Sequence, residues 1–481
     1  MSSFKEYLAL KYRSTNLLLD PIYNSIQFTS NVLQEIDEKT ERDLIDNPWL
    51  QRLRKIHQLQ STFWVYPSAE NSRFTHSVGT MHIAGEFGKV LYEDLKENFK
   101  NKCPSMCFIE EFLRLCGLLH DIGHGPFGHM FDESFLEQKY QLNHEKIGEK
   151  IINTELADII LKIKRSPSGF FKKEEKIKPE YISYVINRSA VYKTSFPPWL
   201  KALRALFCGK FFTVDNLDYV IRDSYFTGYS KDPIKTDRIM FYTSINKEGL
   251  VFASAGKNTF KQFLNIKSDL YNSIYFHRTV RSIDLAIESI FYKTMERFCN
   301  FNPVENLEKY LDINEWSLFN TCNGWTNSKN KTERELGAKW CKIISRERTW
   351  FVALERELTL KPDQEALFFS RFFNSSEFEK NIYDKLIEKF GKDEIRNITV
   401  TVDTKKHDPR PLDINLEEKM KIFDSHTNKI EEKRVLDWIK DFPSRVIIFR
   451  VYTNNKEYVK NISEISNNLM SELDSAFTTN I

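Results

Sequence analysis

The spacing of apolar residues predicts a helical body over most of the first 300 residues. In residues 109–120 the apolar positions and one histidine recur every three or four residues, so they share one helical face, and the run ends at the glycines and proline of residues 123–126. Residues 257–301 contain neither Gly nor Pro and keep the same spacing, which predicts one or two long helices. We therefore expect residues 17–300 to be almost continuous helix.

The pattern changes in the last third of the chain. Residues 314–330 are rich in Asn, Ser and Thr and predict a loop or a domain boundary. Three segments have the β-branched character of strands, the third more weakly: residues 398–403, 444–453 and 419–423. The expected fold is mainly α, with a helical domain over residues 1–300 and a smaller lobe of helices and mixed α/β structure over residues 301–481.

Composition and charge exclude several classes of protein. The 481 residues include 38 Phe, 20 Tyr and 8 Trp but only 16 Gly and 15 Pro, and 41% are hydrophobic. The chain is therefore neither collagen-like nor of low complexity, and it can bury a large core. Seventy Lys and Arg against 67 Asp and Glu leave a formal charge of +3, which demands neither a nucleic acid nor a membrane surface as partner.

Further features bear on compartment and partners. The most basic stretch, residues 162–178, also contains Glu174 and Glu175, and we interpret it as a solvated loop rather than a patch that attracts phosphate. The first 14 residues have no apolar signal core and no run of 18 apolar residues occurs, so we expect no membrane segment and a cytoplasmic location. The seven cysteines form no C-x-x-C pair, so neither a disulfide framework nor a thiolate zinc site is indicated.

Histidines are concentrated in one part of the chain. Seven of the ten lie within 88 residues, at positions 57, 76, 82, 120, 124, 129 and 144, and this density indicates a metal or acid–base site. His120 and Asp121 end the helix predicted above. His76 opens a second amphipathic helix, whose apolar face we place at Ile83, Phe87 and Val90, while His82 falls off that face and is expected at the surface.

Two histidines and two carboxylates suit a divalent ion. Asp215 begins a third predicted helix, and with His76, His120 and Asp121 it offers mixed imidazole and carboxylate ligands. Such a set is typical of an octahedral Mn, Fe, Co or Mg ion with open positions for water and phosphate. Any one of these residues is equally consistent with a buried polar group, so the four have to be judged together.

Five strings carry a family resemblance: DNPWLQRLRKIHQL (46–59), RFTHSVG (73–79), LLHDIGHGPFGHMFD (118–132), NHEKIG (143–148) and VDNLDYVIRD (214–223). They resemble the HD-domain phosphohydrolases, and among these the deoxynucleoside triphosphate (dNTP) triphosphohydrolases. The resemblance is dense over residues 17–300 and loose beyond. It implies an HD-domain helical bundle.

The resemblance also implies roles for the chemical residues. It implies metal ligands at His76, His120, Asp121 and Asp215, which would hold one or two divalent ions. It places four further residues around the reacting phosphate: His124, His129, His144 and Asp132. We predict that His129, positioned with Asp132, donates the proton to the departing 5′-oxygen, and that the other two histidines orient water and the α-phosphate.

The substrate contacts implied by the resemblance come from four segments. Arg73 is expected at phosphate oxygens, Tyr219 and Asp223 at phosphate and sugar, and Gln58 and Leu59 at the 3′-hydroxyl and the 2′ position. Core packing is an equally open interpretation of Leu59.

A fourth segment, on the long helix from residue 257, matches the part of the family that closes the triphosphate pocket, through Lys267, Tyr271 and Tyr275. Here the chain departs from the human SAM-and-HD-domain member of the family. That member has Arg and His in place of Lys267 and Tyr271, and a phosphate-binding Lys in place of Asn216. The departures weaken the expected recognition of the γ-phosphate.

Regulation is a further implication. Asp46, Gln51 and Arg54 match the positions that hold an activating guanine nucleotide, GTP or dGTP, at the oligomer interface of regulated members. A helix start with structural polar contacts explains the same segment equally well. The resemblance also implies a homo-oligomer, a dimer or a tetramer.

Three functions remain open from the sequence. The first is metal-dependent hydrolysis of dNTPs to deoxynucleoside and inorganic triphosphate. The second is an HD phosphohydrolase of another nucleotide, such as a monophosphate, a cyclic nucleotide or a guanosine tetraphosphate. The third is a nucleotide-sensing or single-stranded nucleic-acid-binding module, which the aromatic residues and the basic stretch would suit.

Overall fold

The computed structural model describes residues 14–30, 37–209, 212–360, 374–407, 419–434 and 445–479, together with residues 4, 5, 8, 12 and 438. The chain forms two compact units that interleave along the sequence. The first unit contains residues 1–266, 292–321 and 410–439, and the second contains residues 267–291, 322–409 and 440–481.

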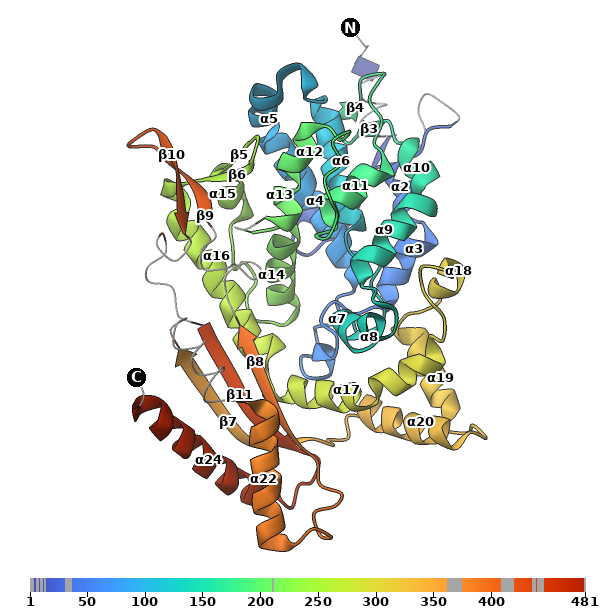
Figure 1. Cartoon of the computed structure of the whole chain (residues 1–481). Coiled ribbons are helices and arrows are strands. Elements are labelled where there is room, and N and C mark those ends of the chain that lie inside the picture. Colours follow the sequence, from blue (N-terminus) through green and yellow to red (C-terminus); the bar gives the residue numbers. More distant parts are fainter. Residues whose placement is uncertain are drawn as a thin grey trace. The chain divides into compact units, whose positions relative to one another are not determined.

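The first unit is mainly helical (Figure 1). Its helices before residue 200 are α2 (Glu41–Ile45), α3 (Pro48–Arg52), α4 (Arg73–Val90), α5 (Tyr92–Phe99), α6 (Met106–Leu119), α7 (His129–Phe131), α8 (Glu137–Tyr140), α9 (His144–Thr154), α10 (Ala157–Leu161), α11 (Pro179–Ile186) and α12 (Pro198–Leu203). Those that follow are α13 (Ala205–Cys208), α14 (Val214–Phe226), α15 (Thr236–Phe241) and α18 (Leu307–Tyr310), with most of α16 (Lys257–Leu270) and the start of α19 (Glu315–Trp325).

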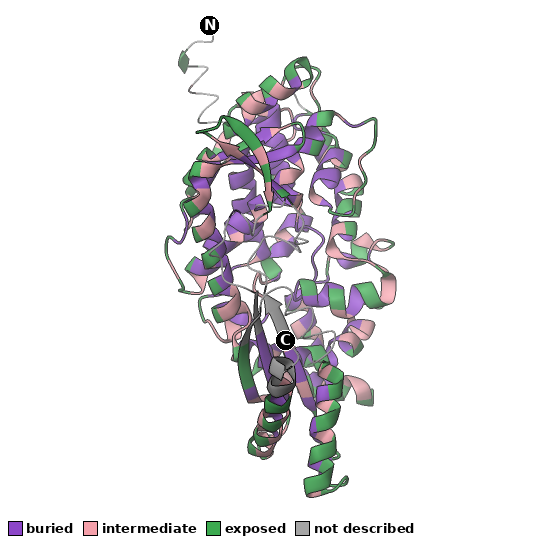
Figure 2. Ribbon diagram, turned by 60° about the vertical axis from the view of Figure 1, so that its left-hand side comes forward, coloured by how far each residue is buried: buried purple, intermediate pink, exposed green. Residues whose placement is uncertain are grey.

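Helices α4 and α6 form the centre of this unit, and glycines let them approach closely. A Cβ on Gly117 would lie 2.6 Å from the carbonyl oxygen of Thr80, and one on Gly85 would lie 2.6 Å from Cγ of Arg114. Residues 108–119 of α6 are all buried, and each large apolar side chain among them contributes about 1.5–3 kcal/mol of burial free energy (Figure 2). This close packing brings the end of α6 beside the first turn of α4.

Among the described residues, the first unit has three small sheets. Strands β1 (Thr15–Asp20) and β2 (Asn24–Thr29) form one hairpin, and β3 (Arg165–Ser166) and β4 (Gly169–Phe170) form another. The third sheet has the order β10-β9-β6-β5, with β5 (Thr243–Asn246), β6 (Gly249–Ala253), β9 (Lys419–Asp424) and β10 (Lys429–Arg434). Strand β9 runs parallel to β6, so a segment from the last third of the chain completes a sheet of the first unit.

The described part of the second unit is built on an antiparallel sheet. Its order is β7-β11-β8, formed by β7 (Phe351–Leu360), β11 (Arg445–Thr453) and β8 (Val400–His407). Helices α22 (Ser375–Phe390) and α24 (Val459–Thr479) pack on it around a core that includes Phe378, Leu386, Phe449, Val451 and Ile462. Most of α17 (Arg278–Phe298) and helix α20 (Lys331–Ile344) also belong to this unit.

Several expectations are confirmed. The fold is mainly α with small sheets, and strands form at all three predicted segments. Residues 257–301 contain two long helices, α16 and α17, separated by a π-helical turn at Tyr271–Tyr275.

Other expectations are wrong. Residues 17–300 are not continuous helix, because β1 to β6 interrupt them. Residues 315–325 form α19 rather than a loop, since Asn side chains cap helices here: Asn314 Oδ1 accepts from the amide of Ser317, and Asn330 Oδ1, just before α20, accepts from that of Thr332. The predicted boundary does fall in this segment, between Thr321 and Cys322. The basic stretch is a loop in its second half, residues 171–178, but its first half contains the β3–β4 hairpin, in which Arg165 is buried against Glu38.

Two residues of α4 also differ from expectation. Val90, placed on the apolar face, is half exposed because it ends the helix, and His82 is half-buried with its ring 4.9 Å from that of Tyr23. Within the described residues, no helix combines the length and the apolar character needed to cross a membrane.

Candidate metal and histidine site

Three helices bring four predicted ligands together. His76 lies in the first turn of α4, His120 caps the C-terminus of α6 and precedes Asp121, and Asp215 is the second residue of α14. Helix α14 begins here because the hydroxyl of Thr213 accepts a hydrogen bond from the amide of Asn216 at 3.0 Å.

The donor atoms lie at distances that fit one cation. Nε2 of His76 is 3.2 Å from Nε2 of His120 and 3.1 Å from Oδ1 of Asp215. Oδ1 of Asp121 is 3.3 Å from Nε2 of His120, and its Oδ2 is 3.9 Å from Nε2 of His76. Ligand atoms about 2.1 Å from one ion are about 3.0 Å apart at a right angle and about 3.4 Å apart at a tetrahedral angle. The residues therefore fit a divalent ion held by two imidazoles and two carboxylates.

The second nitrogen of each histidine is already engaged. Nδ1 of His76 lies 2.7 Å from Oδ2 of Asp218, and Nδ1 of His120 lies 2.8 Å from the carbonyl oxygen of Gly117. Each Nδ1 can donate its proton to that acceptor, which leaves both Nε2 lone pairs facing the shared position. Outer partners of this kind orient metal-binding histidines.

Asp218 is a site residue that the sequence did not single out. It is fully buried, receives two hydrogen bonds from Arg222 at 2.8 and 3.0 Å, and accepts one from the Tyr23 hydroxyl at 2.8 Å. Arg222 also donates to Asp20 at 2.8 Å. Asp218 follows Asp215 by one helical turn, and this i, i+3 spacing is the signal that would have identified it.

A glycine makes room for this outer shell. A Cβ on Gly79 would collide with the carboxylate of Asp218 and the guanidinium of Arg222. The glycine that follows His76 by three residues therefore has a steric role.

The charges of the site favour a cation. Although burial opposes its charged form, hydrogen bonds to Asp215 and Asp218 raise the pKa of His76 to about 10. The pKa of Asp215 is lowered despite burial, because His120 and His76 donate to it. The pKa of Asp121 is likewise held well below its usual value, by His120 and Arg73. A divalent ion would be stabilised by the same carboxylates.

Arg73 contacts a predicted ligand. Its Nη1 donates to Oδ2 of Asp121 at 2.6 Å, while its buried Nε has no partner among the described residues. Its expected contact with phosphate stays a prediction.

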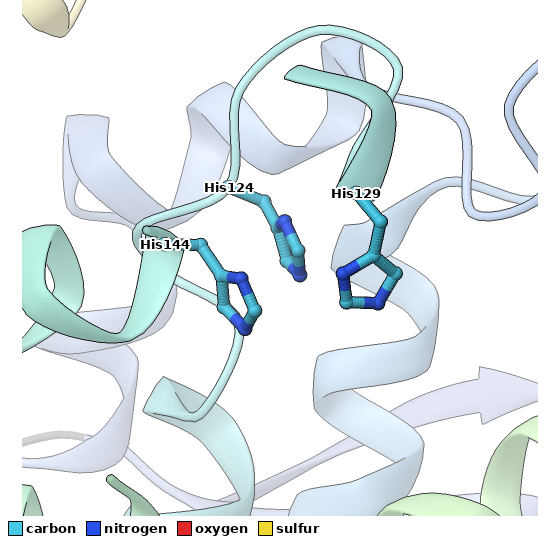
Figure 3. Close-up of side chains that lie close together, drawn as sticks. All are labelled: His124, His129 and His144. Carbon is cyan, nitrogen blue, oxygen red and sulfur yellow. The ribbon is translucent and has the colours of Figure 1, made fainter. Parts of the chain in front are cut away.

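A second group of histidines lies beside the first. The rings of His124 and His144 stack at 3.7 Å with 16° between their planes, and His129 meets both edge-on at 5.0 and 5.3 Å (Figure 3). Nδ1 of His144 is 2.5 Å from Oδ2 of Asp132, whereas Nδ1 of His129 is 3.9 Å from the same oxygen. Asp132 thus stands behind two of the three imidazoles.

This group is less suited to a metal ion than the first. Its ring nitrogens approach within 4.8 Å of one another, but stacked imidazoles direct their lone pairs along similar lines rather than towards one point. Burial, Arg73 and His144 hold the pKa of His124 well below its usual value. The side chain of His129 is 62% exposed. Its pKa is nevertheless lowered, by partial burial and by the nearby His144 and Arg73. Neutral imidazoles beside an open edge suit proton transfer.

The predicted sugar-reading residues are connected. The backbone amide of Gln58 donates to the backbone carbonyl oxygen of Asn71 at 2.9 Å. The side-chain Nδ2 of Asn71 donates to Oδ1 of Asp223 at 3.2 Å. The buried side-chain oxygens of Gln58 and Asn71 have no partner among the described residues. Leu59 and Tyr219 are half-buried. These two side-chain oxygens could accept hydrogen bonds from a hydroxyl group of a ligand.

The remaining predicted contacts lie in the other unit of the chain. Lys267, Tyr271 and Tyr275 belong to the second unit, where the π-helical turn alters their i, i+4 spacing and the two tyrosine rings meet edge-on at 4.8 Å. Their role stays a prediction.

The predicted activator residues make local contacts. Nε2 of Gln51 donates to the carbonyl oxygen of Ile45 at 2.7 Å, Nε of Arg54 donates to Gln51, and exposed Asp46 pairs with Arg42. Such contacts fit a helix start, where Asn47 caps α3. A nucleotide contact there stays a prediction.

Comparisons with known proteins match part of the helical region. A family model described as the HD domain matches residues 73–186. The chain is 27% identical over 288 residues to the uncharacterized protein YwfO of Bacillus subtilis, which covers 60% of this chain and 57% of that protein. It is 25% identical over 312 residues to the deoxynucleoside triphosphate triphosphohydrolase SAMHD1 homolog of Dictyostelium discoideum, over 63% of this chain and 54% of that protein. The chain spans about half the length of these curated relatives.

Two solved structures share the fold. A hypothetical protein from Aquifex aeolicus superposes with a TM-score of 0.65 at 21% identity, over 94% of this chain and 99% of that one. A phosphohydrolase from Bacteroides thetaiotaomicron superposes with a TM-score of 0.61 at 19% identity, over 91% and 99% of the two chains. The fold thus extends beyond the residues matched by the HD model.

Proposed function

From the premise that this chain is an HD-domain protein of the dNTPase-like kind, we propose that it is a metal-dependent nucleotide phosphohydrolase that converts dNTPs to deoxynucleoside and inorganic triphosphate. One observation carries the proposal: His76, His120, Asp121 and Asp215 present converging donors, and both imidazoles are oriented by partners at Nδ1. When bound, a divalent ion at these donors would lower the pKa of a water molecule and neutralise phosphoryl oxygens.

The second group of histidines supports a proton-transfer role. His129 is open to a ligand, and Asp132 lies behind it and behind His144. Substrate phosphates bring negative charge, and we expect them to raise the pKa of His129, so that its imidazole takes up the proton that the departing 5′-oxygen needs. His124 and His144, fixed by stacking, would orient the α-phosphate and water.

Deoxyribose selectivity rests on the Gln58 segment. The unpartnered oxygens of Gln58 and Asn71 can accept a hydrogen bond from the 3′-hydroxyl, and Leu59 would crowd a 2′-hydroxyl. Activation by GTP or dGTP at Asp46, Gln51 and Arg54, in a homo-oligomer, is a further part of the proposal.

Product analysis tests the reaction. Purified protein with Mn²⁺ or Mg²⁺ should consume dGTP and release deoxyguanosine and triphosphate, with neither dGMP nor pyrophosphate. The same incubation with the Asp121→Asn variant is the control and should leave dGTP intact. Release of dGMP or only orthophosphate by the wild type would contradict the triphosphohydrolase reaction.

A second substrate class is favoured by one residue. Asn216 is buried beside Asp215, with 3.4 Å between Nδ2 and Oδ2, at the position where the family resemblance implies a phosphate-binding Lys. A neutral amide there favours a nucleotide with fewer phosphates. A panel of dNTPs, nucleoside monophosphates, cyclic nucleotides and guanosine tetraphosphate, analysed by chromatography, separates the two classes.

A further inference from the structure

The loop that links the two groups of site histidines is held by side chains from outside the matched HD region. Residues 122–128, which we call the HD loop, run from Asp121 to His129. Arg52 donates to the carbonyl oxygens of Ile122 and His124 at 3.4 and 2.6 Å. The hydroxyl of Tyr310 donates to the carbonyl oxygen of Gly123 at 2.8 Å.

The end of the HD loop has a conformation that needs support. Phe127 has φ +61° and Gly128 has φ +51°, so two successive residues lie at positive φ. For a residue with a side chain, such a conformation costs about 1–3 kcal/mol and persists only where surrounding contacts fix it. His129 directly follows Gly128. The backbone direction at Phe127 and Gly128 therefore determines where the His129 ring points.

Glu315 supplies the contact at this turn. Its carboxylate is fully buried, and Oε1 accepts a hydrogen bond from the amide of Phe127 at 3.1 Å. The same carboxylate accepts from the amide of His57 at 3.3 Å and contacts Nδ1 of that ring. Its place as the first residue of α19 fixes its backbone.

His57 holds the Glu315 carboxylate in place. Its Nε2 lies 2.9 Å from Glu70, so the ring bridges two acidic groups, the two titratable partners that face it. Against the effect of burial, Glu315 and Glu70 raise the pKa of His57. The segment before Gln58 is thereby tied, through one carboxylate, to the backbone beside His129.

We propose that Glu315 is a positioning residue for the hydrolysis, which fixes the turn at Phe127 and thereby the placement of the His129 imidazole. This inference rests on the proposed function for its catalytic part. Glu315 lies 188 residues from Phe127 in sequence and outside the matched HD region, so its role follows from the contact alone.

Two substitutions at one position separate positioning from packing. Glu315→Ala removes the acceptor for the Phe127 amide, and we expect kcat to fall at least about 10-fold, since misplacement of a catalytic group by about 1 Å costs up to about 100-fold. KM and metal content should change much less. Glu315→Gln keeps an amide oxygen for Phe127 and should recover most of the lost kcat.

Glu41→Gln is the matched control. Glu41 is also fully buried and pairs with Arg114 at 2.6 Å, outside the histidine site. The Glu41→Gln substitution should lower Tm and leave kcat unchanged. Wild-type kcat in Glu315→Ala, or equal losses in Glu315→Ala and Glu315→Gln, would overturn the proposal.

Hydrogen exchange keeps this test independent of the reaction. Glu315→Ala should accelerate amide exchange in peptides that cover residues 122–131, whereas Glu315→Gln and Glu41→Gln should not. If the wild type hydrolyses none of the nucleotides, the proposed function fails, and the exchange data still decide whether Glu315 holds the loop. Unchanged exchange in Glu315→Ala would overturn the positioning role in either case.

Discussion

Two groups of histidines lie next to each other in this protein, and their surroundings shift the histidine pKa values in opposite directions. His76 and His120 are enclosed by carboxylates, and their pKa values are raised. Burial lowers the pKa values of His124 and His129, and the nearby Arg73 and His144 lower them further. The first environment stabilises positive charge, and the second keeps imidazoles neutral. The same side chain is thus prepared for a cation in one group and for proton transfer in the other.

The largest effect is expected in the first group. Asp121→Asn removes a carboxylate from the shared position, so the variant should lose its metal and its activity should fall to background. We expect the loss to exceed the ~10²–10⁴-fold typical for removal of a general acid. Nucleotide hydrolysis and metal content of the purified variant check this. An active variant without metal would remove the distinction between the two groups.

The next largest effect is expected in the second group. His129→Gln removes the proposed proton donor and should lower kcat by ~10²–10⁴-fold. The metal should remain, because His129 is not one of the four residues whose donor atoms converge. Steady-state kinetics and metal analysis on one preparation test both halves. Loss of the metal in this variant would contradict the separation of roles.

A smaller effect is expected from the outer shell of the first group. Asp218→Asn weakens the contact that orients His76, and such partners typically change metal affinity by 10–100-fold. Competition with a chelator measures the affinity. An affinity within twofold of the wild type would show that Asp218 serves packing alone. Gly79→Ala, which crowds the same carboxylate, should shift the affinity in the same direction.

The smallest effect concerns stability against pH. His124 has a lowered pKa when folded and an ordinary value of 6.5 when unfolded, so the unfolded chain binds more protons as the pH falls below 6.5. The free energy of unfolding should therefore drop below pH 6.5 in the wild type and less so in His124→Gln. Urea unfolding at pH 8 and pH 5.5 measures both. An equal loss of unfolding free energy between pH 8 and pH 5.5 in the two proteins would contradict a neutral, buried His124.

The sequence was informative where local patterns decide the structure. His76, His120, Asp121 and Asp215 were found because each lies at a helix end within a recognisable string, and the structure brings them together. The strands at residues 398–403, 419–423 and 444–453 followed from their β-branched residues. The helix at Glu315–Trp325 could not be predicted from its composition, because Asn is common both in loops and at helix caps, and Asn314 caps this helix.

Residues whose role depends on distant contacts were missed. Asp218 contacts His76 across 142 residues, and Glu315 contacts His57 across 258. Neither carboxylate stands out in its own segment, because its partner is chosen by the packing of helices rather than by local sequence. Hairpins such as β1–β2, with exposed Leu17 and Leu19, escaped for a related reason, since their apolar residues do not show which face is buried.

The most direct test of the account is the metal content of two matched variants, measured by elemental analysis after purification without added metal. The account predicts about one divalent ion per chain in the wild type, none in His120→Ala, and an unchanged content in His144→Ala, because only the first residue belongs to the converging donors. A metal retained in His120→Ala but lost in His144→Ala would contradict it.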